Sequence, residues 1–342
     1  MKIKLYTNDV RKMWDDYVYI HPHGTLFHLI GWKNVIEKSF GYKPWYFYIE
    51  DQGVIKGILP LFAVKKPLFG TNLVSVPFGV YGGFCATGAA AETMLIARAK
   101  QLAIEVEADS LEFRHVETNG HDFPTKNLYV TFHRELYADD EQNLQVIPRK
   151  QRRMIRQGMK HDLRAKMGGE EDLKGFYDIY AQSLRNLGTP AFPRHYFHTL
   201  LDEFGEQCRI LSVWQGGTLV AAVMSFFFKD RVMPYYGGGL KEYFRYSIND
   251  FMYWELMRYA SRRGFRVFDF GRSRQESGSY AFKKHWGFEP KPLPYQYYLP
   301  EGGDVPNLSP TNPKFHLLIA LWKRLPLSVA NVIGPLIIRY LP

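Results

Sequence analysis

The chain has 342 residues, of which 46% are hydrophobic and 23% are charged, and its formal net charge is +10. This composition excludes an intrinsically disordered protein, and the length is sufficient for two domains that each have a core. The two cysteines, Cys85 and Cys208, match neither a disulfide framework nor a zinc site, so we expect no bound metal.

The N-terminal residues, MKIKLYTNDVRKMW, alternate polar and apolar side chains and lack the apolar core of a signal peptide. No run of the sequence reaches the roughly 18 to 20 uncharged apolar residues that cross a bilayer as a helix. We therefore expect the body of the protein to be cytoplasmic. The excess positive charge favours a nucleic acid, an anionic membrane surface or a phosphorylated substrate as a partner.

The first elements in chain order are a hairpin, a strand, a helix and a second strand. Residues 45–64 hold two apolar runs around a turn at Gln52 and Gly53, which predicts a β-hairpin. A strand at 73–76, a helix over 89–106 and a short strand at 111–114 are predicted to follow.

Residues 148–166 hold eight Lys or Arg and one Asp, and therefore much of the excess charge. At about 100° per residue, five of these cations share one face of a helix. We predict a basic helix that joins two units and binds an anion, with a solvated linker as the alternative. The cations of this stripe are Arg149, Arg153, Arg156, Lys160 and Arg164.

The same order of elements recurs after this basic segment. Residues 208–228 predict a second hairpin, which turns at Gly216 and Gly217. A strand at 233–236, a helix over 249–263 and a strand at 268–270 are predicted next.

Landmark residues occupy matching places in the two halves. Tyr81-Gly82-Gly83 corresponds to Tyr236-Gly237-Gly238, and Glu112 corresponds to Asp269. Repetition of a whole series of elements indicates internal duplication, and a chance similarity of two segments is the alternative.

Residues 268–288, FDFGRSRQESGSYAFKKHWGF, carry a family resemblance. The part from Tyr280 to Phe288 resembles the helix with an aromatic-x-x-x-aromatic-Gly-Phe motif that precedes the last hairpin of GNAT acyltransferases, and residues 295–299 would form the next strand. Two such units, joined by a basic segment of the RxxIR type at 152–156, resemble the FemAB family over residues 20–300. Members of that family transfer amino acids from aminoacyl-tRNA to the peptide of a cell-wall precursor.

The resemblance implies an α/β (α+β) fold of two tandem GNAT-like units. We expect the first unit at 1–147, a basic helical connector at 148–168, the second unit at 169–305 and a C-terminal tail at 306–342. The stretch SPTNPK at 309–314, with the LWKRLPLSVANVIGP that follows, resembles the FemAB-like proteins associated with exosortase (PEP-CTERM) and exopolysaccharide systems.

The phosphate-binding loop of CoA-dependent GNAT enzymes, Q/R-x-x-G-x-G/A before a helix, is missing from the second half. Residues 238–248 lack it, and 82–89 are glycine-rich without the leading Gln or Arg. The closest match, 275–280, follows the closing strand. We therefore expect no cofactor, with aminoacyl-tRNA as the acyl donor and acyl-CoA as the alternative.

Acyl transfer requires that the nucleophile lose a proton, that the oxyanion be stabilised and that the leaving oxygen be reprotonated. The resemblance implies that Lys283 steadies charge at the reacting centre; a surface lysine is the alternative. Asp269 is expected to act as a base or to bind an amine, and Tyr280 to donate a hydroxyl; a structural Asp–Arg pair is the alternative for Asp269. No Ser-His-Asp or Cys-His pattern is present, which favours direct transfer.

The candidate substrate-binding residues are arginines and tyrosines near the same motif, their counterparts in the first half and the basic stripe. They are Arg272, Arg274, Tyr236, Glu112, Arg114, Arg153, Arg156 and Lys160.

The tail from Phe315 has two apolar stretches, which Lys323 and Arg324 separate and which Pro326 and Pro335 interrupt. This pattern suits an interfacial segment on a membrane, and packing on the protein is the alternative.

Three functions are consistent with the sequence. The first is a FemAB-like aminoacyl- or acyltransferase that modifies a peptidoglycan or exopolysaccharide precursor, which can be lipid-linked, at the cytoplasmic membrane face. The second is an acyl-CoA-dependent O- or N-acyltransferase of exopolysaccharide biosynthesis. The third is a non-catalytic scaffold or RNA-binding protein.

Overall fold

A computed structural model describes residues 1–66, 70–117, 120–305 and 316–341. The chain divides into two compact units. Unit 1 comprises Met1–Tyr129, Pro292–Asn307 and Arg339–Pro342, and unit 2 comprises Val130–Lys291 and Leu308–Ile338. Both units therefore contain segments from distant parts of the sequence, whereas the expected segments 1–147, 148–168, 169–305 and 306–342 are each contiguous.

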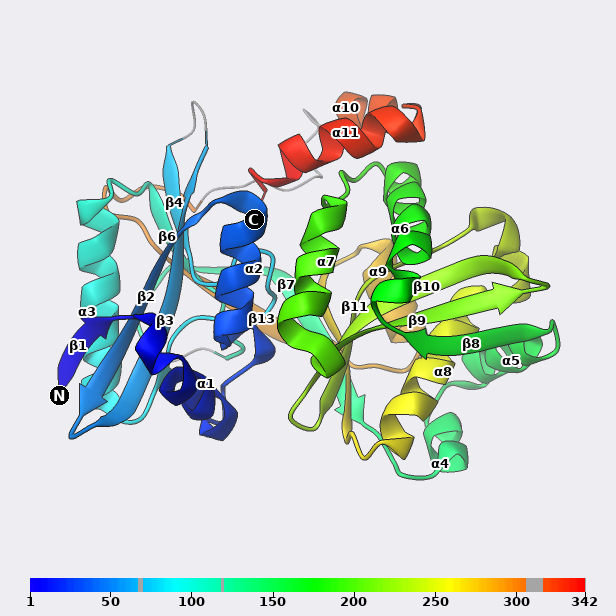
Figure 1. Cartoon of the computed structure of the whole chain (residues 1–342), viewed down its shortest axis with the longest axis horizontal. Helices are drawn as coiled ribbons and strands as arrows, with labels where there is room; N and C mark the ends of the chain where they lie inside the picture. The colour runs from blue at the N-terminus through cyan, green and yellow to red at the C-terminus, as the bar shows by residue number, and fades with distance from the viewer. Residues whose placement is uncertain (67–69, 118–119, 306–315, 342) are drawn as a thin grey trace. The chain divides into compact units, whose positions relative to one another are not determined.

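Unit 1 is a sheet with helices on both faces. Helix α3 covers one face, and α1 and α2 cover the other (Figure 1). In chain order the elements are β1 (Lys2–Leu5), α1 (Arg11–Ile20), α2 (Ile30–Phe40), β2 (Lys43–Asp51), β3 (Val54–Lys65), β4 (Thr71–Val74), β5 (Cys85–Ala86), α3 (Ala89–Glu105), β6 (Ser110–Phe113) and the start of β7 (Thr125–Glu135).

The hairpin, the strands and the helix predicted for unit 1 are present close to the expected residues. β2 and β3 form the expected hairpin, and both turn residues have positive φ, 49° at Gln52 and 79° at Gly53. Such angles belong to the type I′ turn, whose twist matches that of the flanking strands. The sheet order is β1-β2-β3-β4-β6, with β4 and β6 parallel.

The last strand, β13 (Lys291–Tyr298), is a strand as expected, but it does not close unit 2. It pairs antiparallel with β6 of unit 1, with Gln296 opposite Phe113 and Tyr298 opposite Leu111. Strand β7 follows the first repeat in the sequence, yet its residues from Val130 belong to unit 2, where β7 neighbours β12. The closing strands of the two repeats are therefore exchanged.

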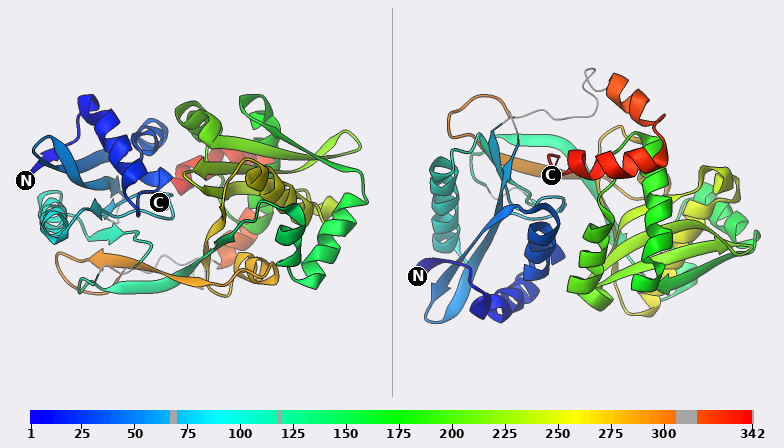
Figure 2. Two further views of the ribbon diagram at one scale, coloured as in Figure 1. Left: turned by 90° about the horizontal axis from the view of Figure 1, so that it is seen from below. Right: turned by 45° about the horizontal axis from the view of Figure 1, so that its top comes forward.

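Unit 2 has the sheet order β7-β12-β11-β10-β9-β8, with α6 and α7 on one face and α8 on the other (Figures 1 and 2). Its elements are α4 (Asp140–Gln145), α5 (Arg149–Met159), β8 (Leu163–Gly168), α6 (Leu173–Leu187), α7 (Arg194–Phe204), β9 (Cys208–Gln215), β10 (Thr218–Phe228), β11 (Arg231–Gly239), α8 (Ile248–Arg262), β12 (Val267–Arg274), α9 (Gly278–His285), α10 (His316–Trp322) and α11 (Leu327–Ile338).

The predicted basic helix is shorter than expected. Helix α5 ends at Met159, and Asp162 has a positive φ of 49° that turns the chain into β8. Arg164 therefore lies in a strand, beside Asp162 at 3.3 Å, and its assignment to the helical stripe is wrong. Residues share a helical face only if they belong to the same helix. Here the chain leaves the helix after Met159, because the residues from Leu163 pair with β9 as strand β8. Arg149, Arg153, Arg156 and Lys160 remain as exposed cations.

The tail forms two helices that belong to unit 2, except for its last residues. Helix α11 contacts α6, and its buried residues Ala330, Gly334 and Ile338 recur every four positions and therefore share one face. A Cβ at Gly334 would lie 3.1 Å from the backbone of Ala191, which follows α6 in the chain. No helix among the described residues is both long and apolar enough to span a bilayer. The SPTNPK stretch lies outside the described residues.

Candidate active site

The parallel strands β11 and β12 of unit 2 pair over a short distance only. Arg231 is opposite Val267 and Val232 opposite Phe268, but β11 continues to Gly239 and β12 to Arg274 beyond the paired register. Backbone groups on the facing sides of the two strands are thereby released from the ladder. Ligands of α/β proteins bind where parallel strands separate at their carboxyl ends, so this opening is the candidate site.

Gly271 breaks the regular geometry of β12 at this opening, with a positive φ of 63°. Successive carbonyl groups of an extended strand point to opposite sides. Here three consecutive carbonyls, those of Phe270, Gly271 and Arg272, converge on one atom, the Nζ of Lys283. The distances from Nζ to the three oxygens are 2.7, 3.1 and 3.1 Å. The glycine thus allows the strand to form a cradle for a cation.

Lys283 is buried, with 8% of its surface exposed, although it lies on the short helix α9. The rings of Phe132 and Phe270 have their centroids 5.6 and 5.9 Å from its Nζ. Burial lowers the pKa of Lys283 to about 7, and the nearby Asp269 opposes this shift. Since an ammonium group has three hydrogens, the three carbonyls satisfy it completely. The lysine is therefore a fixed part of the site rather than a mobile surface side chain.

Asp269 faces away from its apolar neighbours, as the alternation of a strand requires. It is fully buried, and it accepts hydrogen bonds from the backbone N–H of Gly271 and from Nη1 of Arg231, both at 2.7 Å. The Asp–Arg pair that the sequence allows is present, but its arginine comes from β11. Arg231 therefore ties the two strands together where they separate.

His133 of β7 also interacts electrostatically with Asp269 and Arg231. Burial lowers the pKa of His133, while Asp269 raises it. No sequence pattern indicates His133 or Arg231, because each lies near a strand end next to other charged residues. Only the neighbouring order of β7, β12 and β11 brings them to one carboxylate.

The other candidate residues of the motif lie near the same end of β12. The ring of Tyr280 contacts that of Phe132 at a centroid distance of 5.5 Å, and its backbone N–H caps α9 by donating to Ser277. Arg272 and Arg274 are half-buried on β12. The structure therefore groups four predicted residues of unit 2, Lys283, Asp269, Tyr280 and Arg272, around this strand end.

Tyr236 belongs to a different cluster. Its hydroxyl lies 2.8 Å from that of Tyr196 on α7, and the rings of Phe192, Phe197 and Tyr180 surround it. Burial holds the pKa of Tyr236 well above its usual value. The hydroxyl of Tyr236 therefore joins β11 to α7 through this hydrogen bond. Its role as a hydrogen-bond donor to a substrate stays a prediction.

Glu112 and Arg114 form a structural pair within unit 1. Nε of Arg114 donates to Glu112 at 2.6 Å, and Nη1 donates to the carbonyls of Val76 and Gly79 at 3.1 and 2.9 Å. Arg114 is 2% exposed. The pair therefore holds the loop that follows β4, and a contact of these residues with an acceptor stays a prediction.

A cysteine and a histidine meet in unit 1, although the sequence shows no such pattern. The Sγ of Cys85 lies 3.6 Å from Nε2 of His28, and both residues are buried. The backbone N–H of Thr25 donates to Nδ1 of His28, so the neutral ring carries its hydrogen on Nε2. His28 cannot then accept a proton from the thiol, and the pair does not form a nucleophilic dyad.

The start of α8 is where a CoA-dependent GNAT enzyme binds pyrophosphate. In this chain a buried carboxylate, Asp250, lies in the first turn of α8 and accepts from Nε2 of Gln151 and Nε1 of Trp286 at 3.0 and 3.1 Å. Burial raises the pKa of Asp250. Helix α5 packs on α8, and the bond from Gln151 to Asp250 joins the two helices. The first turn of α8 therefore holds a buried carboxylate at the place where CoA-dependent GNAT enzymes have a phosphate-binding loop.

Gly158 allows α5 to approach α8 closely. A Cβ at this position would lie 2.9 Å from the Cβ of Phe251. We expect Gly158→Ala to lower the free energy of unfolding by about 1 to 3 kcal/mol, the usual cost of overpacking. Chemical denaturation would measure this, with Gly278→Ala as the control because nothing lies within 4 Å of its Cβ position. Equal stability of the two variants would contradict the close approach.

Comparisons with known proteins agree with this architecture. Residues 142–284 match the acetyltransferase (GNAT) domain family, whereas no curated protein matches the chain. The structure is similar to that of FemX, with 16% identity, a TM-score of 0.70 and coverage of 93% of this chain and 100% of that one.

Two further structures share the fold. A tandem GNAT protein from the clavulanic acid biosynthesis pathway has 12% identity and a TM-score of 0.55, covering 89% of this chain and 99% of that one. L-PGS from Bacillus licheniformis has 13% identity and a TM-score of 0.55, covering 86% and 96%. The fold is therefore α/β with two tandem GNAT-like units, and unit 2 contains a GNAT acyltransferase domain.

Proposed function

We propose that unit 2 transfers an acyl or aminoacyl group directly from donor to acceptor, with FemAB-like chemistry, and that the acceptor is a peptidoglycan or exopolysaccharide precursor. The observation that carries the proposal is the opening between β11 and β12, with the buried cation of Lys283 at its edge. A reacting carbonyl placed there meets released backbone N–H groups and the charge of protonated Lys283, which acts electrostatically because its hydrogens are held by three carbonyls. Both kinds of group stabilise an oxyanion.

The proposed reaction is an addition followed by an elimination. The acceptor's amine or hydroxyl attacks the donor's ester carbonyl, the C–O bond to the donor breaks, and the proton lost by the acceptor passes to the leaving oxygen. Lys283 stabilises the negative charge of the intermediate. Asp269, held by Arg231, positions the strand end, and Tyr280, Arg272 and Arg274 bind the substrates.

The start of α8 supports aminoacyl-tRNA rather than acyl-CoA as the donor. Asp250 stands where pyrophosphate would bind, and no glycine-rich loop compensates for its charge. The exposed cations Arg153, Arg156 and Lys160 of α5 offer a surface that suits the phosphates of RNA. We propose that this stripe holds the acceptor stem of the tRNA.

The tail supports a location at the inner face of the cytoplasmic membrane. Many apolar side chains of α10 and α11 are exposed although α11 packs on α6 with one face. Exposed Lys323 and Arg324 lie between the helices, and such cations favour anionic lipid surfaces. The exposed apolar residues are Leu317, Leu318, Leu321, Val329, Val332, Ile333, Leu336 and Ile337.

A transfer assay with the full-length protein tests this function. Charged tRNA mixtures and acetyl-CoA are each supplied with cytoplasmic envelope precursors, and the products are analysed by mass spectrometry. We expect an adduct from aminoacyl-tRNA that is lost with Arg153→Ala/Arg156→Ala, and no adduct from acetyl-CoA. The matched control, Arg262→Ala/Arg263→Ala, removes the same charge from the end of α8.

Two results would overturn the proposal. Tight calorimetric binding of CoA together with acetyl transfer would identify an acyl-CoA-dependent enzyme. RNA binding that weakens steeply with salt, without any adduct from either donor, would identify a non-catalytic RNA-binding protein.

A further inference from the structure

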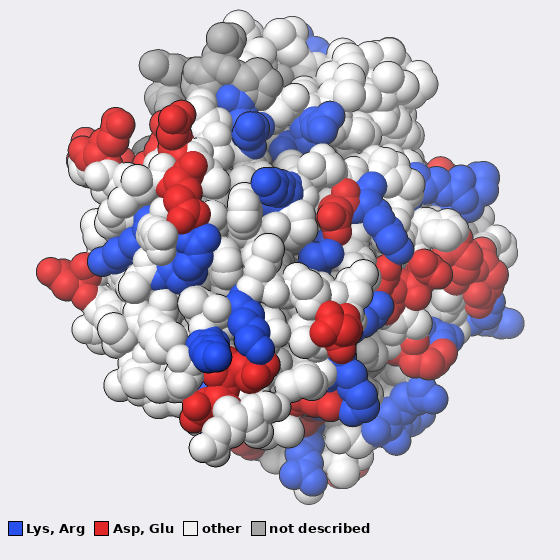
Figure 3. All heavy atoms as spheres, turned by 60° about the vertical axis from the view of Figure 1, so that its left-hand side comes forward, with Lys and Arg blue, Asp and Glu red and all other residues white. Residues whose placement is uncertain are grey.

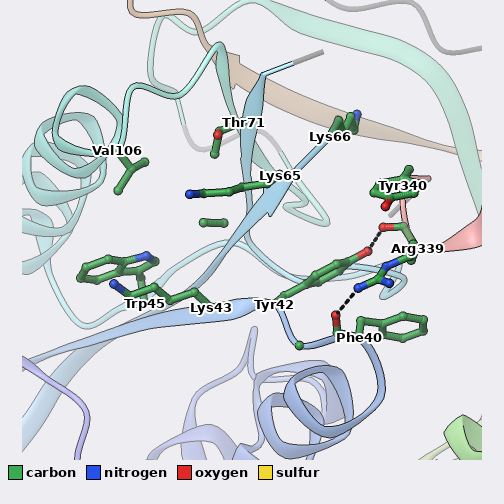
Figure 4. Close-up of a pocket in the computed structure, with 12 residues that line it drawn as sticks. Phe40, Tyr42, Lys43, Trp45, Lys65, Lys66, Thr71, Val106, Arg339 and Tyr340 are labelled. Carbon is green, nitrogen blue, oxygen red and sulfur yellow. Dashed lines mark hydrogen bonds between the residues drawn. The ribbon is translucent and has the colours of Figure 1, made fainter. Parts of the chain in front are cut away.

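Unit 1 contains a hollow at the start of β2 and the end of β3, with a volume of about 690 Å³ (Figure 4). It lies outside unit 2, and the proposed transfer does not use it. All its lining residues belong to unit 1, including Arg339 and Tyr340 from the end of the chain.

Strand register explains why polar side chains gather there. Lys43 is opposite Ala63 and Lys65 is opposite Thr71, so these four residues share one face of the sheet. That face is the one covered by α3, but α3 ends at Glu105 and only its cap residue, Val106, reaches the hollow. The sheet extends beyond the helix and leaves a corner that no apolar side chain fills.

The corner is strongly basic. Lys43, Lys65, Lys66 and Arg339 line it, and no Asp or Glu does. Among the described residues, no carboxylate lies within ion-pairing distance of the three lysines. On the face that Figure 3 shows, Lys and Arg side chains gather in the upper middle part with few acidic ones between them. Glu112 and Asp109 act electrostatically on Lys66 from a greater distance, but the four cations of the lining outnumber them and attract a multiply charged anion.

Aromatic groups complete the walls. Nζ of Lys43 lies 4.2 Å from the centre of the Trp45 ring, and Figure 4 shows Lys65 extending toward the same indole. Nε1 of Trp45 is buried and has no hydrogen-bond partner among the described residues. A buried donor without an acceptor is costly, and an anionic oxygen would satisfy it.

The end of the chain closes one wall of the hollow. Tyr42 donates its hydroxyl to the carbonyl of Arg339, and Nη2 of Arg339 donates to the carbonyl of Phe40 at 3.3 Å. These contacts bring a fourth cation and the ring of Tyr340 to the basic corner. The site is therefore built from the β2–β3 hairpin and from the C-terminal residues together.

We propose that this hollow binds the phosphate group of an organic phosphate, with the lysines and Arg339 around the phosphate and the apolar part of the ligand against Trp45. Lysines pair with phosphate as point charges, and an indole face provides apolar contact area with a hydrogen-bond donor at its edge. A soluble phosphate ester and the phosphate of a lipid headgroup share this chemistry.

Calorimetry on the full-length protein tests the proposal and separates the two sources. The probes are glycerol 3-phosphate and short-chain dihexanoyl phosphatidic acid below its critical micelle concentration. We expect binding of at least one probe, weakened at least tenfold by Lys65→Ala/Lys66→Ala and weakened by added salt. Trp45→Phe is expected to weaken the lipid probe more than glycerol 3-phosphate.

Lys2→Ala/Lys12→Ala is the matched control, since it removes two exposed cations from the same unit. Binding of both probes identifies a phosphate site, and binding of the lipid alone identifies a headgroup site. If neither probe binds, or if both lysine pairs have equal effects, the proposal is wrong and the lysines serve only to complement the carbonyl end of α3. This binding test does not depend on acyl transfer, so the two proposals can fail separately.

Discussion

Lys283→Met is expected to reduce the rate of acyl transfer at least 100-fold, the size of effect that loss of one oxyanion-stabilising group produces. Methionine retains much of the side-chain volume but removes the charge that the three carbonyls of β12 hold. The rate is measured as kcat with saturating donor and acceptor. Lys284→Met, the neighbouring exposed lysine on α9, is the control and should retain full activity.

The same substitution has a cost in stability because it leaves the carbonyls of Phe270, Gly271 and Arg272 without their donor. Each buried unsatisfied group costs about 1 to 3 kcal/mol, although water reaching the strand end would reduce the total. Transfer rates must therefore be compared at a temperature where both proteins are folded. A folded Lys283→Met protein with full activity would show that the lysine only shapes β12.

The pH dependence of stability provides an independent measurement of Lys283. Its pKa is lowered to about 7 from 10.5, so between these values the unfolded chain binds more protons than the folded one. The free energy of unfolding of the wild type, relative to Lys283→Met, should therefore rise with pH from about 7 to 10. The limiting slope is about 1.4 kcal/mol per pH unit. A flat difference would mean that the carbonyl cradle keeps the pKa near its usual value.

Arg231→Met is expected to destabilise the protein by about 3 kcal/mol, because it leaves the fully buried carboxylate of Asp269 without its cation. The N–H of Gly271 still donates to Asp269 in this variant, but the link from β12 to β11 is lost, so the strand end should also lose its shape. Urea denaturation measures the change in stability, and the transfer rate reports the change in the site.

The double variant Arg231→Met/Asp269→Asn separates the ion pair from other effects of the arginine. Removing both charges should recover most of the stability, and the double-mutant cycle gives the coupling energy. Arg262→Met, whose partner Asp140 lies at the surface, is the control and should change stability by less than about 1 kcal/mol. A loss for Arg231→Met as small as this would refute the importance of the buried pair.

The two hairpins, the helices α3 and α8 and the strand before Gly271 could all be predicted from the sequence. These elements depend on turn residues and apolar periodicity, which act over a few neighbouring positions. Lys283, Asp269 and Tyr280 were candidates for a related reason, since the motif that contains them is continuous in the sequence and strand alternation directs Asp269 away from Phe268.

The residues that contact Lys283 and Asp269 could not be predicted from the neighbouring sequence. Arg231 and His133 come from other strands, and three carbonyls converge on Lys283 only because Gly271 has a positive φ. The basic corner of unit 1 likewise depends on strand register and on residues from the end of the chain. Its hydrogen bond between Tyr42 and Arg339 joins residues that are 297 positions apart in the sequence.

Sequence patterns alone indicate a duplicated α/β chain with a GNAT-like motif and without the Q/R-x-x-G-x-G/A loop before α8. The tertiary structure decided that the closing strands are exchanged, that β8 ends the basic helix and that Asp269 pairs with Arg231. The physical reason is the separation along the sequence over which each effect acts. Helix and strand propensity, turn chemistry and strand alternation act between residues that are near neighbours in the sequence. Strand partners and buried ion pairs are selected by the free energy of the whole packed unit.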